Sequence, residues 1–183
     1  MPEHTSNGSA SVSGVAFKRF APGTEAIHVP TTSRRAALAG LSLLTACRPE
    51  VVRAQKRAWR ITSLLGPRAL RGRAAPWSPP LGSEAWSFLL ATWQREAGDF
   101  DSLAVSERET EEGVLRIVLL REGEPVALAK AYAPGHADPL REALALRLLT
   151  ASRPRNFRVP RVLGQGESGG WVYLLTRPLP PRI

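Results

Sequence analysis

A lysine and a glutamate in the second half of the 183-residue chain have the types and the spacing for binding phosphate. Lys130 follows the apolar run Val126–Ala129, which predicts a strand, and Glu142 lies twelve residues further on inside a predicted helix. An ammonium group on a stiff strand, held by a carboxylate from a neighbouring helix, is a fixed point charge for the α- and β-phosphates of a nucleotide. Holding it in place beforehand lowers the ordering cost of binding.

The surroundings of Lys130 bear on this interpretation. Its neighbours Ala129 and Ala131 are small, as a bound nucleotide would require. The alternative is an exposed strand lysine that pairs with Glu142 and has no further role. The two residues alone favour that alternative, whereas the order of the elements around them favours a site.

A sheet and a helix must bring these two residues together. From Phe100 onward the apolar residues recur with a period of two, interrupted by one stretch of helical period. Glu122-Gly123-Glu124-Pro125 predicts a tight hairpin turn. The predicted strands are 101–108, 114–121, 126–132, 161–165 and 170–177, and the predicted helix is 138–151. Their order is β-β-β-α-β-β.

This order, with the residues that it carries, resembles the small lobe of the aminoglycoside phosphotransferase and protein-kinase-like superfamily. Val126-Ala127-Leu128-Ala129-Lys130 stands where that family has its strand-three lysine, and Leu140-Arg141-Glu142-Ala143 where it has the glutamate that pairs with the lysine. The resemblance implies an α+β fold, a kinase-like small lobe in which a five-stranded antiparallel sheet packs with one helix. In this chain an α-helical basic extension would precede the lobe.

The resemblance also implies a nucleotide site. Residues 159–164 and 171–179 look like strands four and five running into the hinge where adenine binds. The expected nucleotide-binding residues are Lys130, Glu142, Thr176, Arg177 and Pro178. The implied cofactor is ATP with Mg²⁺, and the implied acceptor is a hydroxylated small molecule such as a sugar or an aminoglycoside.

The chain departs from the family in two places. The turn at 108–113 has one glycine and three acids where protein kinases have a glycine-rich loop, which points to the small-molecule kinases that often lack that loop. The chain also ends at Ile183, where the family's large lobe follows with its catalytic aspartate and asparagine and its magnesium-binding aspartate. We therefore expect the amino-terminal fragment of a small-molecule phosphotransferase, without catalytic residues or metal ligands, and negligible phosphotransfer by this chain alone.

The charge of the chain is unevenly distributed. Residues 1–98 carry 13 Lys and Arg against 5 Asp and Glu, while residues 99–183 carry 12 against 11. Ten of the basic residues lie between 33 and 73, together with a single acid, Glu50. The predicted parts are a flexible tail at 1–32, in which 14–20 can form a short extended piece, a basic helical extension at 33–98 with a Pro- and Arg-rich linker at 68–82, and the small lobe at 99–183.

Three helices are predicted in the extension. A Ser or Thr among Thr31, Thr32 and Ser33 can cap the first, which runs from Arg34 to about Ala46, and the second runs from Pro49 to Leu65. The third begins at Ser83 and has an apolar stripe that indicates a core-facing surface rather than a docking surface. The stripe consists of Trp86, Leu89, Leu90 and Trp93.

The second helix is basic and amphipathic, and its role stays open. It can bind an anionic membrane or a protein partner, as part of a binding surface at 34–73. Alternatively, the helix packs on the rest of the protein and its basic face is only solvated. The first possibility would make the chain a non-catalytic interaction module. Nucleic acid is disfavoured as a partner, because few aromatic residues interleave with the arginines and no known nucleic-acid-binding motif occurs.

The remaining signals concern compartment and metal. A single cysteine, Cys47, excludes an intrachain disulfide and fits a reducing compartment, and the three histidines have no metal-ligand spacing. Residues 33–47 also look like a twin-arginine leader ending in a lipoprotein box, although the apolar run is too short to span a bilayer. Because ATP is required, we expect a cytoplasmic protein, peripheral to the membrane if the basic helix binds it.

A small lobe on its own has uncovered surfaces. We expect Leu174, Leu175 and Leu179 to be partly exposed, because in the family they pack on or near the large lobe. The helices at 34–65 and 84–97 would cover part of the sheet.

Overall fold

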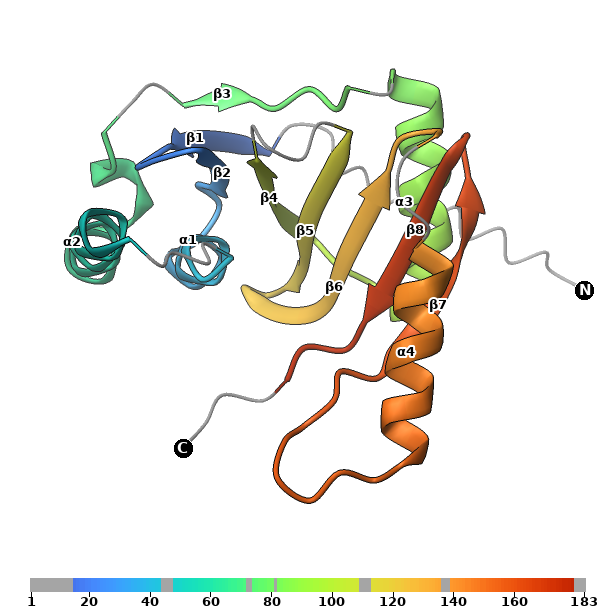
Figure 1. The fold of residues 1–183 in the computed structure, drawn as a ribbon. Coiled ribbons are helices and arrows are strands. Elements are labelled where there is room, and N and C mark those ends of the chain that lie inside the picture. The colour runs from blue at the N-terminus through green and yellow to red at the C-terminus, as the bar shows by residue number, and fades with distance from the viewer. Residues whose placement is uncertain are drawn as a thin grey trace, which may run out of the picture.

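The computed structural model of the chain describes residues 15–43, 48–71, 74–80, 82–108, 113–135 and 139–179. These residues form one antiparallel sheet of eight strands and four α-helices (Figure 1). The strands are β1 Ala16–Phe20, β2 Glu25–Pro30, β3 Ala75–Pro76, β4 Ser102–Arg108, β5 Val114–Arg121, β6 Glu124–Tyr132, β7 Val162–Ser168 and β8 Trp171–Thr176. The helices are α1 Arg34–Leu41, α2 Pro49–Leu65, α3 Ser83–Ala97 and α4 Pro139–Ala151, with a 3-10 turn, η1, at Pro67–Ala69.

Tight turns connect two of the neighbouring strand pairs. The order across the sheet is β3-β1-β2-β4-β5-β6-β8-β7. Glu122 and Gly123, between β5 and β6, have φ of 53° and 81°, and Gly169 and Gly170, between β7 and β8, have φ of 61° and 78°. Two central residues of positive φ match the twist of a two-residue hairpin. The turn predicted at 122–125 is therefore confirmed.

The expected fold class is wrong. We expected a five-stranded antiparallel sheet with one helix behind an α-helical extension, whereas the sheet has eight strands and packs with four helices. The additional strands are β1, β2 and β3: β1 lies in the piece of the tail expected to be extended, whereas β2 and β3 come from residues expected to be a flexible tail or a linker. They extend the sheet beyond β4, because β2 pairs with β4 with Ile27 opposite Ser106. Without β2, β4 would be an edge strand with unpaired backbone groups.

The sequence pattern of β2 explains why it was missed. Ile27 and Val29 point to one face of the sheet and Ala26 to the other, and all three are buried. A strand that is covered on both faces has no alternation of apolar and polar residues, so it has no period-two signal. β2 is also short, with six residues, and so is its neighbour β1, with five.

A small polar cluster ties the segment after β3 to the sheet. Glu107 on β4 lies 3.3 Å from His28 Nε2, and its other oxygen accepts a hydrogen bond from Trp77 Nε1 at 3.0 Å. The hydrogen bond with His28 lowers the pKa of Glu107 below its usual value, although burial opposes this. The segment expected as a linker is therefore held by named contacts around Trp77.

One face of the sheet is covered by α3. Leu89 and Trp93 of its apolar stripe are fully buried and cluster with side chains of β4, β5, β6 and β8. Trp93 also contacts the Tyr173 ring, with 6.4 Å between the ring centroids. The interpretation of this stripe as a core-facing surface is confirmed.

The opposite face is covered in part by α1. Ser33 Oγ caps the helix by accepting a hydrogen bond from Ala36 N at 3.0 Å, as predicted. Ala36 then packs against β4 and β5 side chains, Ala104, Val118 and Leu120, which alternate with those that face α3. The helix ends at Leu41, earlier than the predicted end at Ala46, and residues 44–47 lie outside the described ranges.

The outermost helix is α2. It packs on α1 and lies on the side of the molecule opposite β7 and α4 (Figure 1). It begins with Pro49 in its first turn, where the missing N–H costs no hydrogen bond, and ends at Gly66, whose φ is 83°. Neither α2 nor any other helix in the described ranges is long and apolar enough to cross a membrane.

Candidate functional site

Lys130 lies on an inner strand of the sheet. In β6 it is directly opposite Arg116 of β5 and Leu174 of β8. Opposite residues share a face, so these three side chains lie on the face away from α3. Ala129 and Ala131 point the other way and are buried under α3. They do not line the lysine's surroundings, so the expectation that they make room for a nucleotide is wrong.

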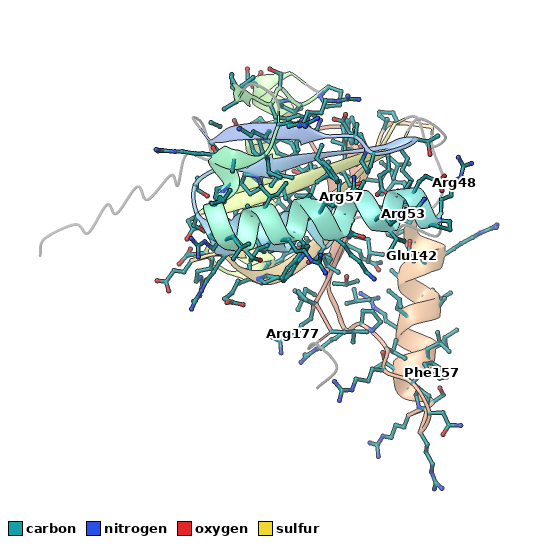
Figure 2. All side chains as sticks on the ribbon, turned by 90° about the vertical axis from the view of Figure 1, so that its left-hand side faces the viewer. Arg48, Arg53, Arg57, Glu142, Phe157 and Arg177 are labelled. Carbon is teal, nitrogen blue, oxygen red and sulfur yellow. The ribbon has the colours of Figure 1, made fainter. Side chains whose placement is uncertain are left out.

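Glu142 reaches Lys130 from the first turn of α4. Lys130 Nζ lies 2.5 Å from Glu142 Oε1 and 2.8 Å from Oε2. Tyr132 Oη donates a further hydrogen bond to Oε2, at 3.2 Å. Figure 2 shows Glu142 at the end of α4 that meets the rest of the molecule, with Phe157 beyond the far end. The structure therefore brings these two predicted residues together.

The pair is accessible as well as fixed. The side chains of Lys130 and Glu142 are 36% and 38% exposed, so a ligand can reach both. The ammonium group has three N–H donors and makes two contacts to the carboxylate, which leaves a donor for an incoming anion. The carboxylate is held from two sides, by Lys130 and by Tyr132. A cation oriented in this way can bind a phosphate with little further ordering.

Arg116 is a residue of this face that sequence reasoning missed. It lies opposite Lys130 and adds a second positive charge beside the formally neutral pair. The tight turn alone would place Arg116 opposite Ala129, on the other face, because Arg121 pairs with Glu124 across it. A register shift between Leu119 and Leu120 moves the pairing by one residue. The only available signal was Pro125, which cannot donate to the ladder and favours an irregularity.

The expected hinge residues lie at the end of β8 and directly after it. Thr176 is opposite Leu128, two positions along β6 from Lys130, and so lies on the same face. Its Oγ1 donates to the Leu128 carbonyl at 3.4 Å, and Arg177 N donates to the Arg161 carbonyl at 2.8 Å. Pro178 comes directly after and is partly buried. Thr176 therefore lies on the same face of the sheet as the pair, and the hydrogen bonds of Thr176 Oγ1 and Arg177 N go to backbone carbonyls rather than to the pair.

Two further expectations concern phosphate and metal. The turn at 108–113 falls largely outside the described ranges, because residues 109–112 are not described. No group of three or more His, Cys, Asp and Glu side chains in the described residues is arranged to hold a metal ion.

The exposed apolar surface is not where it was expected. Leu174 and Leu175 are buried, contrary to the expectation, while Leu179 is exposed as expected. A larger exposed surface lies on α4, along the stripe formed by Leu140, Leu144 and Leu148. The helix turns its small residues inward instead, with Pro139 and Ala143 buried.

No family model, curated protein or solved structure matches this chain.

Proposed function

We propose that the Lys130–Glu142 pair binds the phosphates of ATP, and that the chain supplies the nucleotide-binding part of a phosphotransferase. The acceptor would be a hydroxylated small molecule such as a sugar or an aminoglycoside. The observation that carries the proposal is the ion pair itself, with contacts of 2.5 and 2.8 Å between a strand lysine and a helix glutamate. An inner strand and a helix hold the two groups before any ligand arrives.

The face around the pair supports this proposal. Arg116 and Lys130 give two cations on adjacent strands, which suits the several charges of a polyphosphate. Thr176 lies two positions away along the same face, with Arg177 and Pro178 after it, where the resemblance expects the base. The order β4-β5-β6-α4-β7-β8 agrees with the order on which that resemblance rests.

Each residue would have a limited role. Lys130 neutralises negative charge on the α- and β-phosphates, and Glu142 with Tyr132 keeps the ammonium group in position. An ammonium group that is already protonated cannot take the proton of an acceptor hydroxyl. Transfer to an acceptor therefore needs a base and a metal ion in addition to this pair.

The leucine stripe of α4 supports the idea of a second body. It begins at Leu140, two residues before the carboxylate of the pair, and continues through Leu144 and Leu148. An exposed apolar stripe of this kind favours burial against another protein surface. We propose that the body that brings the acceptor and the base covers α4 here.

Calorimetric titration of the purified chain with ATP tests the proposal. We expect binding in the micromolar to millimolar range, and its loss in Lys130→Ala, because the ammonium group is the main phosphate contact. Lys56→Ala is the matched control, since it removes one lysine charge from the exposed side of α2. Equal loss in both variants would mean non-specific attraction by net charge, and unchanged binding by Lys130→Ala would refute the proposal.

Nucleotide length gives a second readout. If Lys130 binds the α- and β-phosphates, ADP should bind nearly as well as ATP, whereas AMP should bind at least tenfold more weakly. Equal affinities for AMP and ATP would place the phosphates elsewhere. Thermal unfolding of each variant beside these titrations separates lost binding from lost folding.

A further inference from the structure

The two sides of α2 differ in chemistry. Only Ala58 and Thr62 of this helix are buried, and Ala58 belongs to the cluster with α1. The opposite side carries four exposed basic side chains, Arg53, Lys56, Arg57 and Arg60, which we call the basic face. Figure 2 shows Arg53 and Arg57 along this helix, on the side of the molecule turned to the viewer.

The last turn of α2 adds exposed aliphatic side chains. Leu64 and Leu65 are 76% and 72% exposed, and Ile61 is exposed beside them. Residues three and four apart are neighbours on a helix surface, so Ile61, Leu64 and Leu65 form one patch, which we call the apolar tip. Arg57 and Arg60 lie four residues before Ile61 and Leu64 and border this tip.

The charges of the basic face are not neutralised within the described structure. No acid of the described residues forms an ion pair with Arg53, Lys56, Arg57 or Arg60. Glu50, in the first turn, is the only acid of α2 and lies at the end opposite the apolar tip. A cluster of unpaired cations attracts anions, and here it adjoins aliphatic side chains that water solvates poorly.

We propose that α2 docks this protein onto an anionic phospholipid membrane. The apolar tip inserts among the acyl chains at the headgroup boundary, and Arg57 and Arg60 bind headgroup phosphates. At a bilayer surface a helix can bury apolar side chains about 5–10 Å deep at the boundary of headgroups and acyl chains while its cations stay near the phosphates, which suits the arrangement on the last two turns of α2. Nucleic acid offers phosphate but no hydrocarbon, so it would leave the apolar tip in water.

The geometry also sets the strength of this binding. Because the buried side of α2 packs on α1, only the tip can insert, and the contact is shallow and dependent on charge. A basic side chain close to an anionic surface strengthens binding by about fivefold. Binding should therefore need anionic lipid and should weaken as salt shortens the range of the attraction.

Vesicle sedimentation tests the proposal with the whole chain. The probes are vesicles of phosphatidylcholine alone and of phosphatidylcholine with phosphatidylserine, at low and at high salt, beside a tube without vesicles that controls for aggregation. We expect the chain to sediment with the serine-containing vesicles at low salt only. Absence of binding at low salt, or equal binding to both vesicles, refutes the proposal.

Paired variants locate the contact. Leu64→Gln with Leu65→Gln should weaken binding at least tenfold, and Arg57→Glu with Arg60→Glu should abolish it. The matched control is Leu144→Gln with Leu148→Gln, which removes two exposed leucines from α4 and should leave binding unchanged. Equal loss in this control means that any exposed apolar surface suffices, and it refutes the assignment to α2.

Tryptophan fluorescence supplies a direct readout of depth. Trp59 is the only exposed tryptophan among the five, but it lies two residues before Ile61 and so points away from the apolar tip. The reporter is therefore moved to the tip in Trp59→Phe with Leu64→Trp. Brominated lipids should quench the fluorescence of this variant when the vesicles bind and should leave that of Trp59→Phe alone unchanged. Binding of a short RNA through Arg57 and Arg60, with no quenching by lipid, would assign the basic face to nucleic acid instead. Both outcomes are independent of ATP binding at Lys130.

Discussion

The helices α3 and α4 both lie against the C-terminal half of the sheet, but they turn opposite kinds of residue toward it. Leu89 and Trp93 of α3 are fully buried. The leucine stripe of α4 is exposed, and the helix meets the sheet through small residues and the Lys130–Glu142 ion pair. Apolar periodicity predicted both helices, but it does not say whether the surface that buries an apolar stripe belongs to the same chain.

This difference separates two tasks within one sheet. The face under α3 consists of buried apolar side chains and stabilises the fold. The face under α4 is held by an accessible ion pair, whose contribution to stability is small because water solvates both partners. The following substitutions test that division, from the largest expected effect to the smallest.

Trp93→Ala should lower the free energy of unfolding more than the other substitutions. The side chain is fully buried between the sheet and the rings of Trp86 and Tyr173, so its removal leaves a cavity and should lower the free energy of unfolding by about 3–5 kcal/mol. Urea unfolding measures this loss. Trp59→Ala, on the exposed side of α2, is the matched control and should cost less than about 1 kcal/mol. A small loss for Trp93→Ala would mean that α3 is not the covering helix of this face.

The hydrogen bond between Tyr173 and Glu96, which ties α3 to β8, should affect stability at high pH. Tyr173 Oη donates to Glu96 Oε1 at 2.7 Å, and burial, followed by this hydrogen bond, raises the pKa of Tyr173 well above its usual value of 10.0. Above pH 10 the unfolded tyrosine loses its proton while the folded one keeps it, so stability falls as pH rises. Tyr173→Phe should cost about 1 kcal/mol at pH 7 and abolish most of that fall. An unchanged alkaline limb in unfolding measurements would contradict the assignment.

The Lys130–Glu142 ion pair should affect the local opening of α4 more than the global stability of the protein. Glu142→Gln removes the charge that holds Lys130, but both side chains are part-exposed, so the global loss should stay below about 1 kcal/mol. Hydrogen exchange should nevertheless speed up in α4 and stay unchanged in α3, because the ion pair joins the first turn of α4 to β6. Uniform acceleration across both helices would mean that the two faces are not separate.

The smallest effect should come from the leucine stripe. Leu144→Gln keeps the helix propensity and removes an exposed apolar side chain, so stability should change by no more than about 0.5 kcal/mol. Self-association should decrease, as measured by sedimentation velocity, because the stripe offers apolar surface to neighbouring molecules. A loss above about 1 kcal/mol would show that Leu144 is buried within this chain after all.

Local pattern predicted much of the second half of the molecule. The strands and helix between residues 102 and 176 were predicted because alternation and the turn at 122–125 are properties of neighbouring residues. The contact between Lys130 and Glu142 was also predictable, since a short connection brings the first turn of α4 back to β6. Their role toward a nucleotide is still a proposal.

Contacts between distant segments could not be predicted in this way. The position of β2 depends on its pairing with the edge of β4, and the local sequence of β2 does not predict which strand it pairs with. Arg116 faces Lys130 only because the register of β5 and β6 shifts by one residue beyond the turn. The exposure of Leu144 likewise depends on what else packs on α4, which no local pattern contains.

The pairing of β2 with β4 has a consequence during synthesis. Ile27 and its partner Ser106 are separated by about eighty residues, which a ribosome adds at about 5–20 per second. For several seconds the hairpin of β1 and β2 has no strand to join, although α1 and α2, whose side chains pack on Ile27 and Val29, have already been made. A nascent chain arrested before β4 would therefore leave unpaired the backbone N–H and C=O groups on the edge of β2 that later pairs with β4.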